Sequence, residues 1–161
     1  MKKVIGITVL AAQMLAFGCA TRVAVAPRTV KVITGAGIMA TPIGDARAFP
    51  FNDTVAFRFP ITRTSEDGKR ISHSGGVKLS RGHEELSLQR FRVNLRRGYV
   101  SAWVNREVRT AVFTIAESQR PQLGPVRLTF TRTAASAVNK TFGADAFRSG
   151  QNFGYARVNP A

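Results

Sequence analysis

The sequence predicts an all-β protein, specifically a β-sandwich of seven or more short antiparallel strands with one short helix near the C-terminus. Two observations carry this prediction. Apolar and polar side chains alternate in several short segments, and glycine or proline residues separate these segments. A spacing of four residues occurs in one segment, close to the C-terminus. A β-barrel is the nearest alternative fold, because its strands show the same alternation.

The first two predicted strands cover residues 28–34 and 54–62. Residues 28–34 are rich in β-branched side chains that alternate with others. In residues 54–62 the alternation places Phe57 and Phe59 on the face opposite Arg58. Pro60 has no backbone N–H, so we expect an edge strand or a strand end there.

The middle of the sequence predicts a hairpin with an irregularity. Strands are expected at residues 76–80 and 85–96, and the apolar phase shifts between Leu88 and Phe91, which indicates a bulge or bend. A turn at residues 96–98 lets residues 99–104 pair with the preceding strand. Further strands are predicted at residues 108–116, 126–131 and 153–158.

Residues 134–142 predict the helix. Ala134, Val138 and Phe142 are four residues apart and share one helical face. Thr133 is the expected N-cap, and Gly143 is expected to end the helix.

The N-terminus predicts an export signal. Lys2 and Lys3 precede an uncharged run over residues 4–18, which is short for a membrane span of about twenty residues. Cys19, the single cysteine, follows this run and resembles the lipid-bearing cysteine of bacterial lipoproteins. We therefore predict a lipoprotein-type signal peptide over 1–18, lipidation of Cys19, a tether over 19–27 and one domain over 28–161. Cleavage after Ala20 and a retained membrane anchor are the alternatives.

This interpretation places the protein outside the cytoplasm, at the cell membrane or envelope, with secretion as the alternative. The membrane is the first predicted partner, through the lipid. A single cysteine excludes an intramolecular disulfide and a zinc site of several cysteines.

The charge predicts an anionic partner. The chain has 24 Lys and Arg against 9 Asp and Glu, a formal net charge of +15. Arg90, Arg92, Arg96 and Arg127 lie on the polar faces of predicted strands. We predict that they form a basic surface for anionic envelope polymers or lipid headgroups, since guanidinium binds such groups in bidentate fashion. A solvated sheet face is the alternative, and nucleic acid is not expected because no recognition motif is present.

Catalytic chemistry is not indicated. The serines near His73 lack a nucleophile-elbow pattern, and no paired carboxylates have a glycosidase-like spacing. Glu84 and Glu85 beside His83 would point to opposite faces of a strand, which disfavours a metal site. Both histidines are expected in exposed loops. We predict a non-enzymatic binding or structural module with no metal and no cofactor.

Two blocks of sequence carry a family resemblance. The first contains residues 71–79, the Gly82-His83 step and residues 88–94; the second lies within residues 128–158. Together they resemble the haem-transport-associated (HtaA-type) domain, and more closely its short secreted actinobacterial relatives. The resemblance implies a surface β-sandwich, and haem binding through a tyrosine assisted by a histidine is the alternative function. It implies His83 as a ligand-binding residue. Tyr99 and Tyr155 are the two phenols in the chain and match no ligand position of the family; of the two, Tyr99 is our candidate.

Overall fold

The computed structural model describes residues 19–159, so the predicted signal peptide lies outside the described residues. This part of the chain contains eleven strands and two helices. In chain order the elements are β1 (Ala20–Val25), α2 (Pro27–Gly35), β2 (Met39–Ile43), β3 (Arg47–Phe51), β4 (Thr54–Thr64), β5 (Arg70–His73), β6 (Gly76–Arg81), β7 (Glu84–Asn94), β8 (Tyr99–Val104), β9 (Val108–Glu117), β10 (Val126–Phe130), α3 (Arg132–Phe142) and β11 (Asn152–Asn159).

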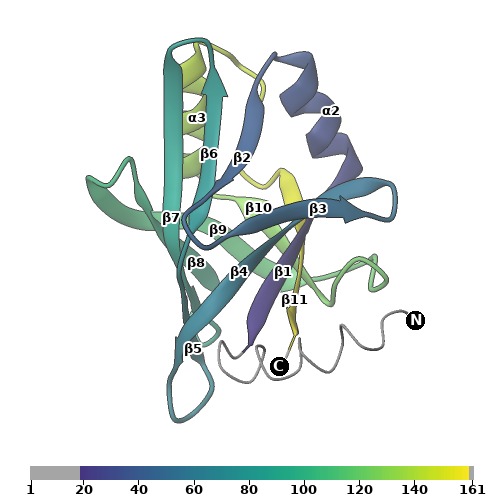
Figure 1. Ribbon diagram of the computed structural model, residues 1–161, viewed down its shortest axis with the longest axis vertical. Helices are drawn as coiled ribbons and strands as arrows, with labels where there is room; N and C mark the ends of the chain where they lie inside the picture. The colour runs from purple at the N-terminus through teal and green to yellow at the C-terminus, as the bar shows by residue number, and fades with distance from the viewer. Residues whose placement is uncertain (1–18, 160–161) are drawn as a thin grey trace.

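The strands form one antiparallel sheet, and eight of them close into a barrel. Their order around the barrel is β7, β5, β4, β1, β11, β10, β9 and β8, and pairing between β7 and β8 completes the ring. Figure 1 shows α2 and α3 at the upper end, and the start of β1 with the end of β11 at the lower end. The all-β prediction is confirmed, as is the short helix near the C-terminus. The barrel takes the place of the expected sandwich, because alternation along single strands does not reveal whether a sheet closes.

The segment predicted as a tether is instead a strand within the barrel. Residues 20–25 form β1, which pairs with β4 on one side and β11 on the other. Val23 and Val25 face the interior, whereas Ala24 packs outside against Ala56 and Tyr155. The small alanines allow a second layer to cover the outer face, so both faces of this strand are buried.

The first predicted strand, residues 28–34, is instead the helix α2. Pro27 stands in its first turn, where a missing N–H costs no hydrogen bond. Thr29 and Ile33 are buried and four residues apart, as on one face of a helix. The Thr29 hydroxyl donates to the carbonyl of Asn152 over 2.6 Å. These tertiary contacts outweigh the β-propensity of the β-branched residues.

Pro60 lies inside a barrel strand, not at an edge. One side of β4 pairs with β1, while the other pairs with β3 up to Arg58 and with β5 from Ile61. Pro60 therefore stands between the part of β4 that pairs with β3 and the part that pairs with β5. Its missing N–H does not interrupt the hydrogen bonds of either pair.

The predicted irregularity between Leu88 and Phe91 is confirmed. The register of β7 against β8 shifts between Gln89 and Arg92, and Arg90 has φ of 55°. Its backbone N–H donates to the carbonyl of Gly75, which separates β5 from β6. The bulge lets β5 and β6 follow one another along the same side of β7.

The predicted helix exists, with a different N-cap. Thr131, not Thr133, accepts a hydrogen bond at 3.1 Å from the N–H of Ala134, and α3 begins at Arg132. Gly143 ends the helix in the left-handed region, as predicted. The helix packs Val138 and Phe142 onto the interior of the sheet.

Candidate functional site

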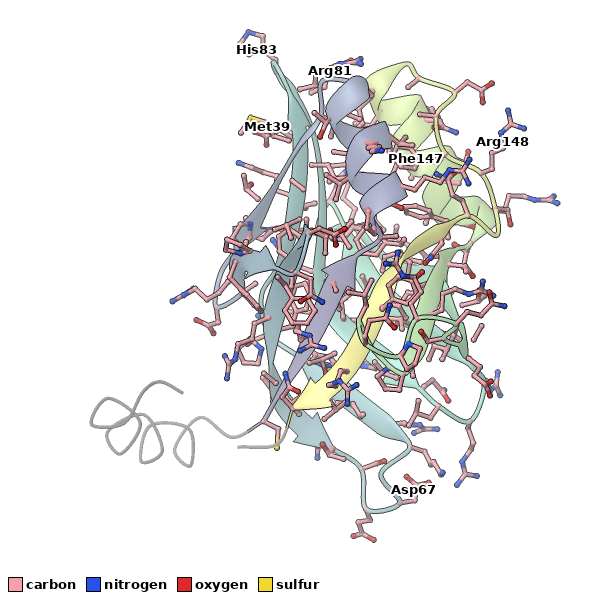
Figure 2. All side chains as sticks on the ribbon, turned by 90° about the vertical axis from the view of Figure 1, so that its right-hand side faces the viewer. Met39, Asp67, Arg81, His83, Phe147 and Arg148 are labelled. Atoms are coloured by element: carbon pink, nitrogen blue, oxygen red, sulfur yellow. The ribbon has the colours of Figure 1, made fainter. Side chains whose placement is uncertain are left out.

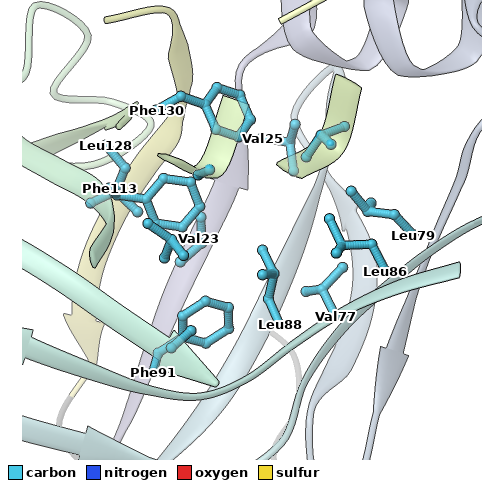
Figure 3. Packing of buried hydrophobic residues seen from close by; sticks show 14 of the residues in the cluster. Val23, Val25, Val77, Leu79, Leu86, Leu88, Phe91, Phe113, Leu128 and Phe130 are labelled. Atoms are coloured by element: carbon cyan, nitrogen blue, oxygen red, sulfur yellow. The ribbon is translucent and has the colours of Figure 1, made fainter. Parts of the chain in front are cut away.

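The interior of the barrel holds an apolar cavity of about 490 Å³. Strands contribute alternate side chains to it, among them Val23 from β1, Phe91 from β7 and Phe113 from β9. Figure 3 shows these side chains pointing toward a shared interior, together with Leu88 and Leu128. Pockets of about 300–1,000 Å³ with mainly apolar walls are typical of small-molecule sites. The cavity is therefore the candidate functional site.

The two ends of the cavity differ. At the upper end, side chains of both helices line it, including Ile33 of α2 and Val138 of α3. At the other end the lining includes Leu95 and Val158, which are 43% and 47% exposed. Val158 lies opposite Thr21 near the start of β1. The lower end therefore presents an apolar rim to the surroundings.

A hydrogen-bonded pair, Thr21 and His73, supplies a polar group in the cavity wall. His73 is 5% exposed, so the prediction of an exposed loop histidine is wrong for this residue. Its Nδ1 lies 3.0 Å from the carbonyl oxygen of Phe91, and its Nε2 lies 2.7 Å from Oγ1 of Thr21. A carbonyl can only accept, so Nδ1 carries the proton and Nε2 accepts from the Thr21 hydroxyl.

The imidazole of His73 is neutral near pH 7. Burial lowers its pKa from the usual value of 6.5, and the hydrogen bond to the Phe91 carbonyl opposes this only in part. Since Thr21 donates its hydroxyl proton to Nε2, its oxygen keeps lone pairs that can accept a further hydrogen bond. Thr21 thus offers an acceptor within a mainly apolar wall, which also includes Thr110 and Thr133.

His83 and Tyr99 do not come together. His83 lies in the turn before β7, and Tyr99 lies opposite Asn94 at the far end of that strand. The eleven residues of β7 separate the two side chains, a distance of about 30 Å. Figure 2 shows His83 at the extreme upper end of the molecule, opposite Asp67. The pair predicted from the resemblance therefore does not fit one haem.

The predicted basic residues also separate. Arg90 and Arg92 lie near Arg109, whose guanidinium donates to the carbonyl of Arg90. Burial, followed by the charges of Arg92 and Arg90, lowers the pKa of Arg109. Arg127 lies on β10, which β8 and β9 separate from β7. The four residues therefore come from separated strands, and one basic surface formed by them stays a prediction.

Arg96 belongs to an ion pair. Its Nη2 lies 2.7 Å from Oδ2 of Asp67 in the loop between β4 and β5. Hydrogen bonds from Ser65, from the backbone N–H of Lys69 and from Arg96 hold the pKa of Asp67 well below its usual range. The charge of Arg96 is therefore partly neutralised within the protein.

Cys19 precedes β1 directly and is half-buried. Its carbonyl accepts a hydrogen bond of 2.9 Å from the N–H of Ile61. It is two residues from Thr21, so it stands beside the lower rim of the cavity.

Two further observations concern metals and membranes. Within residues 19–159, no group of three or more His, Cys, Asp or Glu side chains is arranged to hold a metal ion. In the same part of the chain, no helix is long and apolar enough to span a membrane.

Comparison of the sequence with known proteins finds no matching family model and no significant match among curated proteins. The HtaA-type resemblance therefore stays a prediction.

Sequence reasoning missed Thr21 and His73 as a site. A signal existed, because Thr21 alternates with Val23 and Val25, and His73 stands two residues after Ile71. These positions face the interior by strand alternation. Their meeting depends on β1 and β5 lying on either side of β4 in the sheet, an order that no local pattern indicates.

Proposed function

We propose that this protein is a non-enzymatic, extracytoplasmic binding module that holds an elongated apolar ligand inside its barrel. The observation that carries the proposal is the apolar cavity of about 490 Å³. We further propose, from the N-terminal sequence, that a lipid on Cys19 holds the module at the membrane.

The size and lining of the cavity favour an apolar occupant. Each Å² of apolar surface that a ligand removes from water contributes about 25 cal/mol. A bound apolar ligand would also add contacts to the cavity wall, so we expect it to stabilise the fold.

The chemistry of the wall indicates the class of ligand. An anionic group would have to enter an apolar interior beside a neutral imidazole, which is costly. A hydroxyl, an amide N–H or a protonated carboxyl could instead donate to the oxygen of Thr21. We therefore expect a long apolar molecule with one neutral hydrogen-bond donor.

The proposed anchor suits such a ligand. A lipid on Cys19 would place the rim formed by Leu95 and Val158 toward the bilayer, from which apolar molecules enter a protein without crossing water. Radiolabelled palmitate fed to producing cells should label the wild type and not Cys19→Ser. Equal label in both proteins would reject lipidation at this residue.

A fluorescent apolar probe tests the cavity. We expect N-phenyl-1-naphthylamine to brighten on binding the protein and to be displaced by a long-chain alcohol. Val23→Trp and Leu88→Trp place an indole in the cavity from two strands and should weaken binding at least about tenfold. Met39→Trp adds the same side chain at an exposed position outside the ring and should have no effect.

Circular dichroism and thermal unfolding must first establish that both interior variants are folded. Folded variants that bind the probe as tightly as the wild type would place the probe elsewhere and reject the proposal, as would a wild type that binds no probe.

Haem remains the alternative that the resemblance implies. Adding haemin to the protein should leave its absorption spectrum unchanged if the cavity takes only the ligands described above. A shifted Soret band that disappears in His83→Ala would instead favour haem binding at the predicted residue.

A further inference from the structure

Four arginines stand opposite one another across four adjacent strands. Arg47 of β3 pairs with Arg58 of β4, Arg58 with Arg22 of β1, and Arg22 with Arg157 of β11. We call these four residues the arginine row. None of the four was singled out by the sequence, because they are far apart along the chain and only the register aligns them.

The arginine row lies on the outer face of the barrel. Arg22 stands between Thr21 and Val23, which line the cavity, and Arg58 stands between Phe57 and Phe59. Strand alternation therefore directs the arginines outward. On the next strand, Arg127 lies opposite Tyr155 and shares this outer face.

The charges of the row are not neutralised by carboxylates. The ion pairs within residues 19–159 join Lys78 to Glu85, Arg81 to Glu84 and Arg96 to Asp67, and none includes the row. Side chains directly opposite on paired strands have β-carbons about 5 Å apart, and like charges there are destabilising. The fold therefore maintains repulsion that an anion would relieve.

Neighbouring groups hold three of the guanidinium groups in place. Nη1 of Arg47 donates to the carbonyls of Ala46 and Gly44. Arg22 stacks 4.0 Å from the ring centre of Phe51 and donates to the carbonyl of Leu123. Arg157 donates to the carbonyl of Pro121 in the same loop. Burial, followed by the charge of Arg157, lowers the pKa of Arg22. Each guanidinium has five N–H donors, so these contacts leave others for a ligand.

Two nitrogen atoms also lack partners. The Nε atoms of Arg22 and Arg127 are buried and make no hydrogen bond within the described residues. A buried donor without an acceptor is costly, so the fold holds these two arginines at a cost in stability.

We propose that the arginine row binds a flexible linear polyanion that carries phosphate groups. Arginine, and not lysine, occupies all four positions, and its planar fork matches phosphate oxygens in bidentate fashion. In a barrel of eight strands the surface turns by about 45° from each strand to the next. A flat membrane would therefore touch only part of the row, whereas a flexible chain can follow it around the surface.

Arg157 is also among the residues that line the cavity, whereas Arg47 and Arg58 are not, so substitutions of these two test the row separately from the cavity. The probe is fluorescently labelled long-chain polyphosphate, and binding to the full chain in non-ionic detergent is followed by fluorescence anisotropy. The test variant is Arg47→Gln/Arg58→Gln, because Arg22 and Arg157 also hold the loop before β10. The control Arg132→Gln/Arg148→Gln removes the same charge from exposed positions near α3.

The wild type should bind polyphosphate, and binding should weaken steeply as salt rises. The test variant should bind at least about tenfold more weakly, and the slope of log affinity against log salt should fall by about two. The control should change affinity by less than about twofold. Thermal unfolding within a few degrees of the wild type would show that the variants are folded.

Equal losses in both variants would mean that net charge alone binds the polymer, and the proposal would be wrong. It would also be wrong if the test variant bound like the wild type. Dispersed phosphatidylglycerol at equal phosphate concentration should not displace the polymer, and displacement would favour a membrane surface over a linear polyanion.

Discussion

Replacing Thr21 by valine tests the buried pair in the cavity wall. Valine keeps the shape of threonine and removes the hydroxyl that donates to Nε2 of His73 over 2.7 Å. A buried acceptor left without a donor costs about 1–3 kcal/mol. In a chain of this size 1 kcal/mol shifts Tm by about 2–4 °C, so a cost of 2 kcal/mol predicts a decrease of about 4–8 °C.

The double variant Thr21→Val/His73→Phe distinguishes this pairing from general disruption. It removes both partners of the hydrogen bond, so no buried donor or acceptor of this pair is left without its partner. The Phe91 carbonyl does lose its donor. We expect the double variant to be about 1–2 kcal/mol more stable than the sum of the single effects predicts. Thermal unfolding followed by circular dichroism at pH 8 measures all three variants. Additivity within about 0.5 kcal/mol, or an unchanged Tm in Thr21→Val, would refute the assigned hydrogen bond.

Three further predictions concern the fold and its pH dependence. Gly154→Ala should lower the free energy of unfolding in urea by more than about 2 kcal/mol, because its β-carbon would lie 2.5 Å from the carbonyl oxygen of Ala24 on β1. The control is Gly35→Ala, whose β-carbon meets nothing within 4 Å and which should change that free energy by less than about 1 kcal/mol. Thr131→Ala should lower the free energy of unfolding by about 1 kcal/mol, because α3 loses its N-cap hydrogen bond. Thr131→Ser keeps a hydroxyl and should restore most of this stability, and equal losses in the two variants would contradict the capping role. The free energy of unfolding should fall as the pH drops below 6.5, because the imidazole of His73 takes up a proton more readily in the unfolded chain than in the buried site. His73→Phe should reduce the slope of the free energy of unfolding against pH in this range. An unchanged slope would contradict the burial argument.

Local patterns predicted most strands, because alternation reports one buried face wherever that face meets the core. The same pattern revealed the bulge near Arg90, since an inserted residue shifts the apolar phase. It failed for β1, whose alanines are buried on the outer face, and for α2, where Pro27 and tertiary contacts outweigh β-propensity. The sequence predicted the hairpin of β7 and β8, but closure into a barrel also needs β1 to pair with β4 and β11, which lie far from it in the chain.

The candidate site was less predictable than the fold. Each residue of the Thr21–His73 pair occupies an ordinary alternating position, and only the sheet order brings them together. The arginine row likewise depends on register across four strands. By contrast, His83 stood out in the sequence because of its glycine neighbour, yet it lies in a turn about 30 Å from Tyr99.

A crystal structure determined under xenon pressure tests the central claim most directly, because xenon enters dry apolar cavities and scatters strongly. We predict xenon density inside the barrel, among Val23, Phe91 and Phe113, and its loss in Val23→Trp. A wild-type interior in which these side chains meet without a gap, with no xenon among them, would contradict an apolar ligand site.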